Sequence, residues 1–544
     1  MNIKNIDGPL LRKMIIFAAK NLENNKGIVN ELNVFPVPDG DTGTNMALTI
    51  QFAAKEVAKL NSDSLTKIAD AASSGSLMGA RGNSGVILSQ LFRGFAKACK
   101  NKEQLNIKDL SFAIQSGANM AYKAVMKPTE GTILTIAREA GQYAMKNSKE
   151  QDNITIDTFI KQVINHSKEV LEQTPEMLTV LKEAGVVDAG GMGLIYIMEG
   201  AYKAIFEEDI IVSHKEIEST AGKELGNITT ADIKHTYCTE FMIMAKDASI
   251  NKIKNYLSNK GDSQVVVGDE NIIKVHVHTN NPGEVLEYAL KIGELKNIKI
   301  DNMKEQHRNQ INMETVSKIH NNKETEKDFA FIAVASGEGI TKILIDLGVE
   351  SIIQGGQTMN PSTEDFLSEI DKLNAKHIFI LPNNSNIFLA ANQAKQISNK
   401  NIDVLPTKTI PQGISALLAF NPEKNHKNNY LQMVSAIQEV KTGQVTYAIR
   451  DSKVNSIEIK KDDIIGLYEG KIVASGQDVN QVTSKLISEM LDQDDELITL
   501  FVGEGISKDN RDAMISLLED KFPTIDIESH YGGQPLYYYI ISVE

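Results

Sequence analysis

Residues 33–46 read Asn-Val-Phe-Pro-Val-Pro-Asp-Gly-Asp-Thr-Gly-Thr-Asn-Met, and this stretch is the most informative in the chain. Two carboxylates, Asp39 and Asp41, flank a single glycine just before an amphipathic run begins. Closely spaced carboxylate oxygens suit Mg²⁺, which takes one or two protein carboxylates and completes its shell with water and phosphate oxygens. The alternative is an Asp-Gly turn at the start of a helix. The rest of the chain decides between these interpretations.

The composition describes a multidomain globular protein. The 544 residues are 42% hydrophobic and 24% charged, a length that indicates three or four domains. Because the apolar runs are too short to cross a bilayer and the N-terminus lacks the apolar core of a signal peptide, we expect no integral membrane segment. Two cysteines, Cys99 and Cys238, favour a reducing cytoplasm over a disulfide framework. A net charge of −14 argues against nucleic acid as a partner.

The N-terminal region, residues 1–205, shows apolar residues at helical spacing almost throughout. Glycine-rich connections interrupt the pattern at residues 39–43, 75–85, 127–132 and 185–193. This alternation predicts an all-α helical bundle or barrel whose loops gather at one end.

The middle region, residues 233–317, follows a polar linker at 206–232 and changes period. The pattern predicts strands and helices in the order βαββαβ, the split arrangement of a ferredoxin-like α+β domain. The expected strands are 237–245, 264–268, 272–279 and 297–303, and the expected helices are 248–259 and 283–292. A second polar linker occupies residues 318–328.

The C-terminal region, residues 329–544, reads as α/β with an internal repeat. Gly-Glu-Gly follows a strand at 337–339 and again at 503–505, and Gly-Gly-Gln follows later at 355–357 and 532–534. Repeated units of this kind predict two related lobes, although short glycine-rich turns can also match by chance. We favour the interpretation that these glycine-rich loops are turns of a docking domain without a ligand.

Three further loops of the helical region have the character of phosphate sites. Gly-Asn-Ser-Gly at 82–85 precedes a helix, so its backbone N–H groups and Ser84 hydroxyl would face an anion at the positive end of the helix dipole. Thr132 begins another helix, and 185–193 allows close backbone approach to a flat ligand. Each loop alone could be an ordinary helix cap. Together with Asp39 and Asp41, they favour Mg-nucleotide binding.

Arg81 stands in the glycine-rich connection at 75–85, directly before Gly82. Arginine stabilises spread negative charge, so Arg81 is a candidate for stabilising the transferring phosphoryl group. An exposed surface ion pair is the alternative role.

The middle region contains a candidate zinc site. His276 and His278 are two residues apart on one expected strand and therefore share a face. Cys238 and Glu240 would share that face on the neighbouring strand. Two imidazoles and a thiolate suit Zn²⁺, with Glu240 or water completing the set. Histidines are also common as purely structural residues.

The loops of the helical region resemble the nucleotide-binding domain of the dihydroxyacetone kinase family. The resemblance implies that Asp39 and Asp41 hold magnesium, with Asn33 nearest to a third aspartate of the family and Thr42 in place of a family histidine. The residues that it implies for cofactor binding are Thr42, Asn45, Asn83, Ser84, Gly85, Thr132, Asp188 and Gly190.

A closer resemblance, to the catalytic subunit of bacterial fatty acid kinase, runs through the whole chain. Its motifs include 33–46, Met-Gly-Ala-Arg-Gly-Asn-Ser-Gly at 78–85, Val-His-Val-His-Thr at 275–279 and His-Tyr-Gly-Gly-Gln-Pro at 530–535. The resemblance implies an ATP-dependent kinase that makes acyl-phosphate from a fatty acid held by a separate binding protein. It also implies a Cys-His-His metal set at Cys238, His276 and His278.

The chemistry of the loops is compatible with a carboxylate acceptor. Phosphoryl transfer depends on positioning and charge stabilisation, and a carboxylate is ionised at pH 7 without a base. The four loops hold no histidine, although an aspartate could serve as a base. The C-terminal region resembles the fatty-acid-binding carrier, so we expect it to orient that carrier, and we expect a homodimer formed through the middle region. Two alternatives stay open: a small-hydroxyl kinase resembling dihydroxyacetone kinase, and a nucleotide-binding scaffold or regulator without turnover.

Overall fold

The computed structural model describes residues 4–33, 40–125, 127–150, 154–206, 236–245, 250–257, 260–268, 272–302, 326–356, 360–454 and 457–544. It divides into two compact units, one formed by residues 1–210 together with 326–544 and the other by residues 211–325. The linkers predicted at 206–232 and 318–328 fall almost wholly outside the described residues. Among the described residues, no helix combines the length and apolar character needed to cross a membrane.

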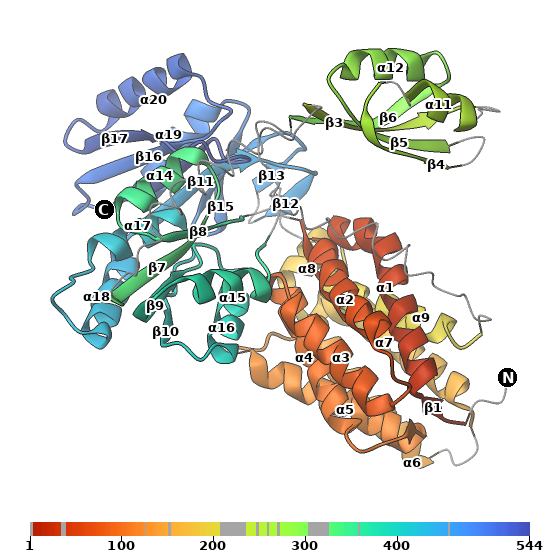
Figure 1. Cartoon of the computed structure of the whole chain (residues 1–544). Coiled ribbons are helices and arrows are strands. Elements are labelled where there is room, and N and C mark those ends of the chain that lie inside the picture. The colour runs from red at the N-terminus through yellow and green to blue at the C-terminus, as the bar shows by residue number, and fades with distance from the viewer. Residues whose placement is uncertain are drawn as a thin grey trace. The chain divides into compact units, whose positions relative to one another are not determined.

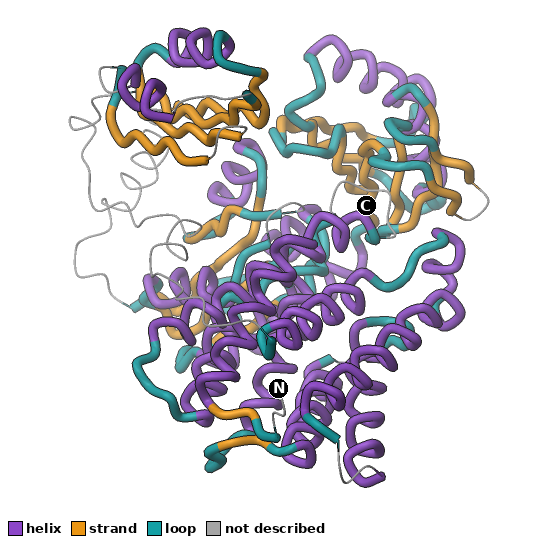
Figure 2. The backbone as a smooth tube through the Cα atoms, turned by 90° about the vertical axis from the view of Figure 1, so that its right-hand side faces the viewer, coloured by secondary structure: helices purple, strands orange, loops and turns teal. Residues whose placement is uncertain are grey.

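The N-terminal region is helical, as the periodicity predicts, and its helices pack side by side (Figures 1 and 2). Its helices are α1 (Gly8–Glu31), α2 (Thr42–Lys59), α3 (Leu65–Met78), α4 (Gly82–Ala98), α5 (Ile107–Ala124), α6 (Ile133–Glu150), α7 (Ile156–Met177), α8 (Thr179–Ala184) and α9 (Ala189–Lys203). Short strands β1 (Ile6–Asp7) and β2 (Gln104–Leu105) pair in an antiparallel arrangement that the sequence pattern did not predict.

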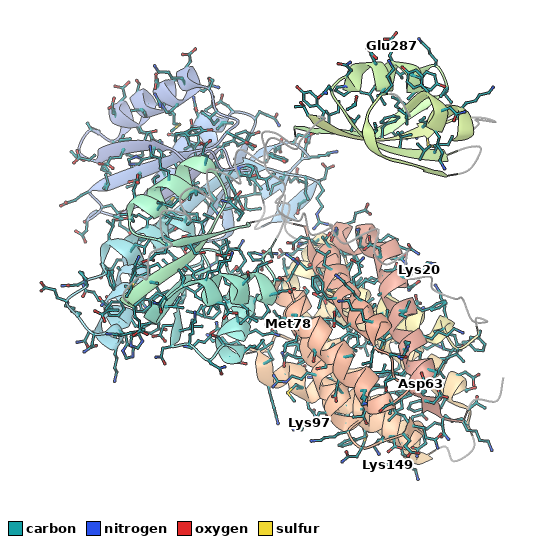
Figure 3. The ribbon with its side chains drawn as sticks, in the orientation of Figure 1. Lys20, Asp63, Met78, Lys97, Lys149 and Glu287 are labelled. Atoms are coloured by element: carbon teal, nitrogen blue, oxygen red, sulfur yellow. The ribbon has the colours of Figure 1, made fainter. Side chains whose placement is uncertain are left out.

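Polar caps and apolar faces explain where these helices form. The side chains of Asp7, Ser64, Asn106 and Asp188 each accept a backbone N–H in the first turn of a helix. Apolar residues at helical spacing, such as Leu22, Ile50 and Phe159, are fully buried. Charged side chains lie on the outside of the same helices, as Figure 3 shows for Lys20, Lys97 and Lys149.

Two of the expected glycine-rich connections are shorter than predicted, because several glycines lie inside helices. Helix α3 continues through Gly75, where an added Cβ would stand 2.6 Å from the carbonyl oxygen of Phe52. Helix α9 contains Gly193, where an added Cβ would stand 2.7 Å from the sulfur of Met46. These glycines permit close helix packing, a role that sequence alone does not distinguish from a turn.

The described residues of the C-terminal region form two large sheets and one two-stranded sheet. The first is fully parallel, with strand order β10-β9-β7-β8. Its elements are β7 (Lys327–Ala335), α14 (Glu338–Asp346), β8 (Ser351–Gln354), α15 (Thr363–Lys372), β9 (Ala375–Leu381), α16 (Phe388–Ile397), β10 (Ile402–Val404), α17 (Ile410–Leu418) and α18 (His426–Glu439).

The second sheet is mixed, with strand order β15-β14-β11-β18-β16-β17. Its elements are β11 (Lys441–Tyr447), β14 (Ile464–Tyr468), β15 (Lys471–Gly476), α19 (Val479–Met490), β16 (Leu497–Val502), α20 (Lys508–Lys521), β17 (Asp526–Tyr531) and β18 (Tyr539–Val543), and a hairpin of β12 (Ser452–Val454) and β13 (Ile457–Ile459) stands beside it.

The internal repeat is present as two parallel βαβ units. One unit is β7-α14-β8 and the other is β16-α20-β17, and a Gly-Gly pair follows the last strand in each. The α/β character that the sequence predicts for this region is therefore confirmed.

The unit formed by residues 211–325 contains one antiparallel sheet with strand order β4-β5-β3-β6. Helices α11 and α12 pack together with the sheet around buried residues that include Phe241 and Val275 (Figure 1). Its elements are β3 (Tyr237–Met244), α11 (Ile250–Leu257), β4 (Asp262–Gly268), β5 (Ile272–Thr279), α12 (Pro282–Leu290) and β6 (Glu294–Asn302). The element order is the expected βαββαβ, and the ferredoxin-like assignment stays a prediction.

Candidate nucleotide site

A cavity of about 340 Å³ opens where the glycine-rich loops of the helical region meet. Most residues predicted for nucleotide or metal binding line it, namely Asn33, Thr42, Asn83, Ser84, Thr132, Asp188 and Gly190. The expectation that these loops gather at one end of the helices therefore agrees with the structure.

Of the three predicted magnesium ligands, Asn33 lines the cavity, Asp41 does not, and Asp39 is not described. Asp39 lies outside the described residues, and Asn33 follows the end of α1 and lines the cavity. Asp41 stands at the N-cap of α2, and its Oδ2 accepts a 2.6 Å hydrogen bond from Nδ2 of Asn360 in the C-terminal region. The Asn30 side chain contacts Thr44 twice, which ties the end of α1 to the start of α2.

The start of α4 is a candidate anion-binding end. Gly82 adopts a positive φ of 57°, and the helix begins there with Asn83 and Ser84 on the cavity wall. First-turn N–H groups have no partner within their helix, so this end is suited to a phosphate.

Two predicted cofactor-binding residues lie behind this wall and do not line the cavity. Asn45 is buried, and its Nδ2 would stand 2.6 Å from a Cβ added at Gly82. A Cβ added at Gly85 would stand 2.4 Å from Oγ1 of Thr49. Both residues therefore shape the phosphate loop by packing, and a direct contact with nucleotide stays a prediction.

The loop before α6 contributes the Thr132 hydroxyl and the Lys127 ammonium group to the cavity wall. Thr132 donates to the carbonyl of Thr129 at 2.7 Å, and both residues line the cavity together with Lys127. Gly131 makes the turn with a φ of 79°. Lys127 was not among the predicted site residues. Its position close to the Thr-Glu-Gly-Thr turn was the feature of the sequence that could have indicated it.

Asp188 is the N-cap of α9, and its Oδ2 accepts the N–H of Gly191 at 2.6 Å. Burial raises the pKa of Asp188 to about 6, while backbone N–H groups of Gly191 and Ile133 oppose the rise. The Asp188 carboxyl group therefore gains or loses its proton at a pH just below neutral.

Arg81 contacts the C-terminal region and does not line the cavity. Its Nη1 donates to the carbonyl of Asn360 at 2.8 Å and lies 3.4 Å from Oδ2 of Asp365. Leu389, from α16 of the C-terminal region, does line the cavity. Neither contact was predictable, because no local pattern indicates which distant segment covers a loop.

The predicted zinc ligands lie on strands whose backbone register is described. Cys238 on β3 stands opposite His278 on β5, and Glu240 stands opposite His276. The side chains of these four residues lie outside the described residues. Among the side chains that the structure describes, no cluster of three or more His, Cys, Asp or Glu residues could hold a metal ion.

Family models match the three regions separately. The DAK2 domain matches residues 36–203, the middle domain of FakA-like fatty acid kinase proteins matches residues 234–310, and the C-terminal domain of the same proteins matches residues 330–544. Two of the three models thus carry the same family name.

Similarity to full-length relatives and to solved structures was compared separately. Protein YloV of Bacillus subtilis is 43% identical over 562 residues, and an uncharacterized protein of Staphylococcus haemolyticus is 42% identical over 553, with 100% of each chain covered in both cases. A DegV family protein of Corynebacterium glutamicum matches 40% of this chain and 96% of its own, with 14% identity and a TM-score of 0.31. The fatty acid kinase B3 protein of Streptococcus pneumoniae matches 40% of this chain and 99% of its own, with 12% identity and a TM-score of 0.27.

The three regional matches and the relatives that extend over its full length agree with the resemblance drawn from the motifs. The chain therefore belongs to the FakA-like family of fatty acid kinase proteins and carries a DAK2 domain in its N-terminal region.

Proposed function

We propose that the chain is an ATP-dependent kinase that transfers the terminal phosphoryl group of ATP to the carboxylate of a fatty acid. A separate fatty-acid-binding protein presents the acid, and the products are acyl-phosphate and ADP. One carboxylate oxygen forms the new P–O bond, and the bond between the β–γ bridging oxygen and the γ-phosphorus breaks. The family assignment and the loop-lined cavity support this proposal.

Magnesium would be held by Asp39 and Asp41, with Asn33 as a third candidate. When bound, Mg²⁺ neutralises charge on the phosphate oxygens. The donor set is chemically suitable, because it consists of hard oxygen ligands. The N-terminus of α4 would take phosphate oxygens, and Lys127 would add a positive charge to the cavity wall.

The scarcity of candidate bases among the described residues that line the cavity is the observation that favours a carboxylate acceptor. Among the described residues that line the cavity, Asp188 alone carries a carboxyl group and none is a histidine. Asp188 already accepts two backbone N–H groups as a helix cap. A fatty acid carboxylate needs no deprotonation at pH 7, whereas a hydroxyl acceptor usually does.

The raised pKa of Asp188 favours one alternative, because a carboxylate that titrates near 6 is a stronger base than an ordinary one. A small-hydroxyl kinase that uses Asp188 as base is therefore the second candidate function. A scaffold that binds nucleotide without turnover is the third.

One assay separates these three functions. The purified chain would be incubated with Mg-ATP and oleic acid, with and without a fatty-acid-binding protein, and in parallel with dihydroxyacetone. We expect acyl-phosphate only when the binding protein is present. Turnover of dihydroxyacetone without it would refute the proposal, and ADP formation under neither condition would support the scaffold. Asp39→Ala and Asp41→Ala should each abolish turnover, and an unaltered rate would reject that residue as a magnesium ligand.

We further propose a structural Zn²⁺ in the middle region, held by Cys238, His276 and His278. The direct pairing of Cys238 with His278 supports it, and the register adds Asp301 opposite Cys238 as a candidate fourth position. Zinc content of Cys238→Ala, measured by mass spectrometry, tests the proposal, and unchanged zinc would reject Cys238. Cys99→Ala is the control, because burial raises the pKa of the Cys99 thiol to about 12 and keeps it protonated.

The remaining parts of the proposal concern organisation. The helical kinase domain would span residues 1–205, the metal-binding middle domain residues 233–317, and a docking domain for the carrier residues 329–544. The middle domain would form a homodimer, and the protein would act in the cytoplasm. Light scattering of the purified chain tests the dimer.

A further inference from the structure

The C-terminal region reaches the candidate magnesium loop through one buried amide. Asn360, which precedes α15, is 1% exposed and donates from Nδ2 to Oδ2 of Asp41 at 2.6 Å. The two residues are 319 positions apart in the chain. We propose that Asn360 is a positioning residue of the magnesium site, so that the C-terminal region completes the site; this inference rests on the proposed function of Asp41.

The backbone of Asn360 is held firmly against the helical region. Arg81 Nη1 donates to the carbonyl of Asn360 at 2.8 Å, and Arg81 forms an isolated antiparallel β-bridge with Ser362. The N–H of Thr363 donates to the carbonyl of Ala80 at 3.2 Å. These contacts tie the backbone that carries the Asn360 amide to the loop before α4.

The start of α15 braces the same segment. The Ser362 hydroxyl and the Asp365 carboxylate exchange hydrogen bonds with each other's backbone N–H groups in a capping box. Asp365 also lies 3.4 Å from Nη1 of Arg81. Arg81 therefore clamps the segment that carries Asn360, which gives it a role in the structure away from the phosphates.

Apolar packing surrounds this polar cluster. Ala80 and Val86 of the helical region belong to the same buried cluster as Ile353, Phe366 and other residues of the first C-terminal sheet. Met78, labelled in Figure 3, ends α3, which contacts α15. Because the junction is packed with apolar side chains, a hydrogen bond within it is strengthened and its geometry is fixed.

The hydrogen bond has a clear chemical consequence for a magnesium ligand. An amide donor on one carboxylate oxygen fixes the rotamer of Asp41 and so determines where its carboxylate can meet a cation. Residues that orient metal ligands in this way typically contribute about 10- to 100-fold to metal affinity or activity. Asn360 Oδ1 is buried and has no hydrogen-bond partner among the described residues. A metal-bound water is a donor that would satisfy it.

The test measures metal affinity directly, with the full-length protein and Mn²⁺ as the probe. Electron paramagnetic resonance would report free Mn²⁺ in the presence of a non-hydrolysable ATP analogue. The variants are Asn360→Ala and Asn360→Leu, the second of which nearly preserves the volume of the buried side chain. Gln393→Ala is the matched control, because Gln393 is a buried amide that also joins the C-terminal region to the helical region, through Leu77 and Ser89.

We expect both Asn360 variants to raise the Mn²⁺ dissociation constant by about 10- to 100-fold, with analogue affinity at saturating Mn²⁺ nearly unchanged. Gln393→Ala should leave the constant within twofold of wild type. The positioning role is overturned if the Asn360 variants stay within twofold, or if Gln393→Ala weakens Mn²⁺ equally.

Asp41→Ala distinguishes this inference from the proposed function. If Asp41→Ala leaves Mn²⁺ affinity unchanged, the proposed magnesium site is wrong. If it weakens Mn²⁺ while the Asn360 variants do not, only the positioning role is wrong.

Discussion

Replacement of Asp188 by asparagine should stabilise the nucleotide-free protein at neutral pH. Asparagine is as good a helix N-cap as aspartate, so the cap of α9 would survive the change. The substitution removes a carboxyl group whose pKa burial raises from 3.8 to about 6. The folded state therefore favours the protonated form, and ionisation of the group destabilises the fold.

The size and pH range of the effect follow from this shift. A rise of about two pKa units corresponds to about 3 kcal/mol. Because the folded pKa is raised, the wild-type protein binds more protons when folded than when unfolded between about pH 4 and pH 6, and its stability falls as pH rises through that range. The advantage of Asp188→Asn should grow across this range and remain constant above it.

Thermal unfolding followed by far-ultraviolet circular dichroism, from pH 4 to pH 8 without nucleotide, measures the effect. The matched control is Asp7→Asn, because Asp7 caps α1 of the same region but is exposed. A stability difference between Asp188→Asn and wild type that does not change with pH would refute the reasoning. So would an equal pH-dependent gain in Asp7→Asn.

Two further substitutions test the packing and the electrostatics of the helical region. Gly75→Ala should lower stability by about 1–3 kcal/mol in urea unfolding, because the new methyl group would meet the Phe52 carbonyl at 2.6 Å. Gly27→Ala, in α1 with nothing within 4 Å, should instead stabilise by up to about 1 kcal/mol, and equal effects of the two would contradict this packing argument. Lys127→Ala should weaken ATP binding by about tenfold in calorimetry, since a charge-assisted contact contributes about 1.5 kcal/mol or more. Lys123→Ala, on the exposed end of α5, should leave binding unchanged, and an equal loss would show a general charge effect.

Local patterns were sufficient to predict the helices of the N-terminal region and the loops that line the candidate nucleotide site. The polar residues Asn83, Ser84, Thr132 and Asp188 each stand where an apolar helical pattern begins, so their place at helix N-termini follows from the sequence. Their gathering around one cavity also follows, because short connections in a bundle of antiparallel helices lie at its ends.

Packing roles could not be read from the sequence. Gly75 and Gly193 have the same sequence signature as turn glycines, but they lie inside helices where neighbouring residues approach closely. Asn45 and Gly85 belong to the nucleotide motifs and yet contribute by shaping the backbone behind the cavity. A motif identifies residues that occur together. The structure is required to distinguish the residues that line the cavity from those that pack behind it.

Contacts between distant segments were also beyond prediction, and Arg81 shows why. A lone arginine in a phosphate loop has the right charge for a phosphoryl group, but its guanidinium group is held by Asn360 and Asp365. The guanidinium group has five N–H donors in a rigid planar arrangement, so it can bind a backbone carbonyl and a carboxylate as well as a phosphate. Since Leu389 from the same region lines the cavity, the C-terminal region contributes both to the cavity wall and to the support of Asp41. If a carrier docks on this region, as we propose, it would act on residues that are hydrogen-bonded to Asp41, the proposed magnesium ligand, and docking would then be coupled to phosphoryl transfer.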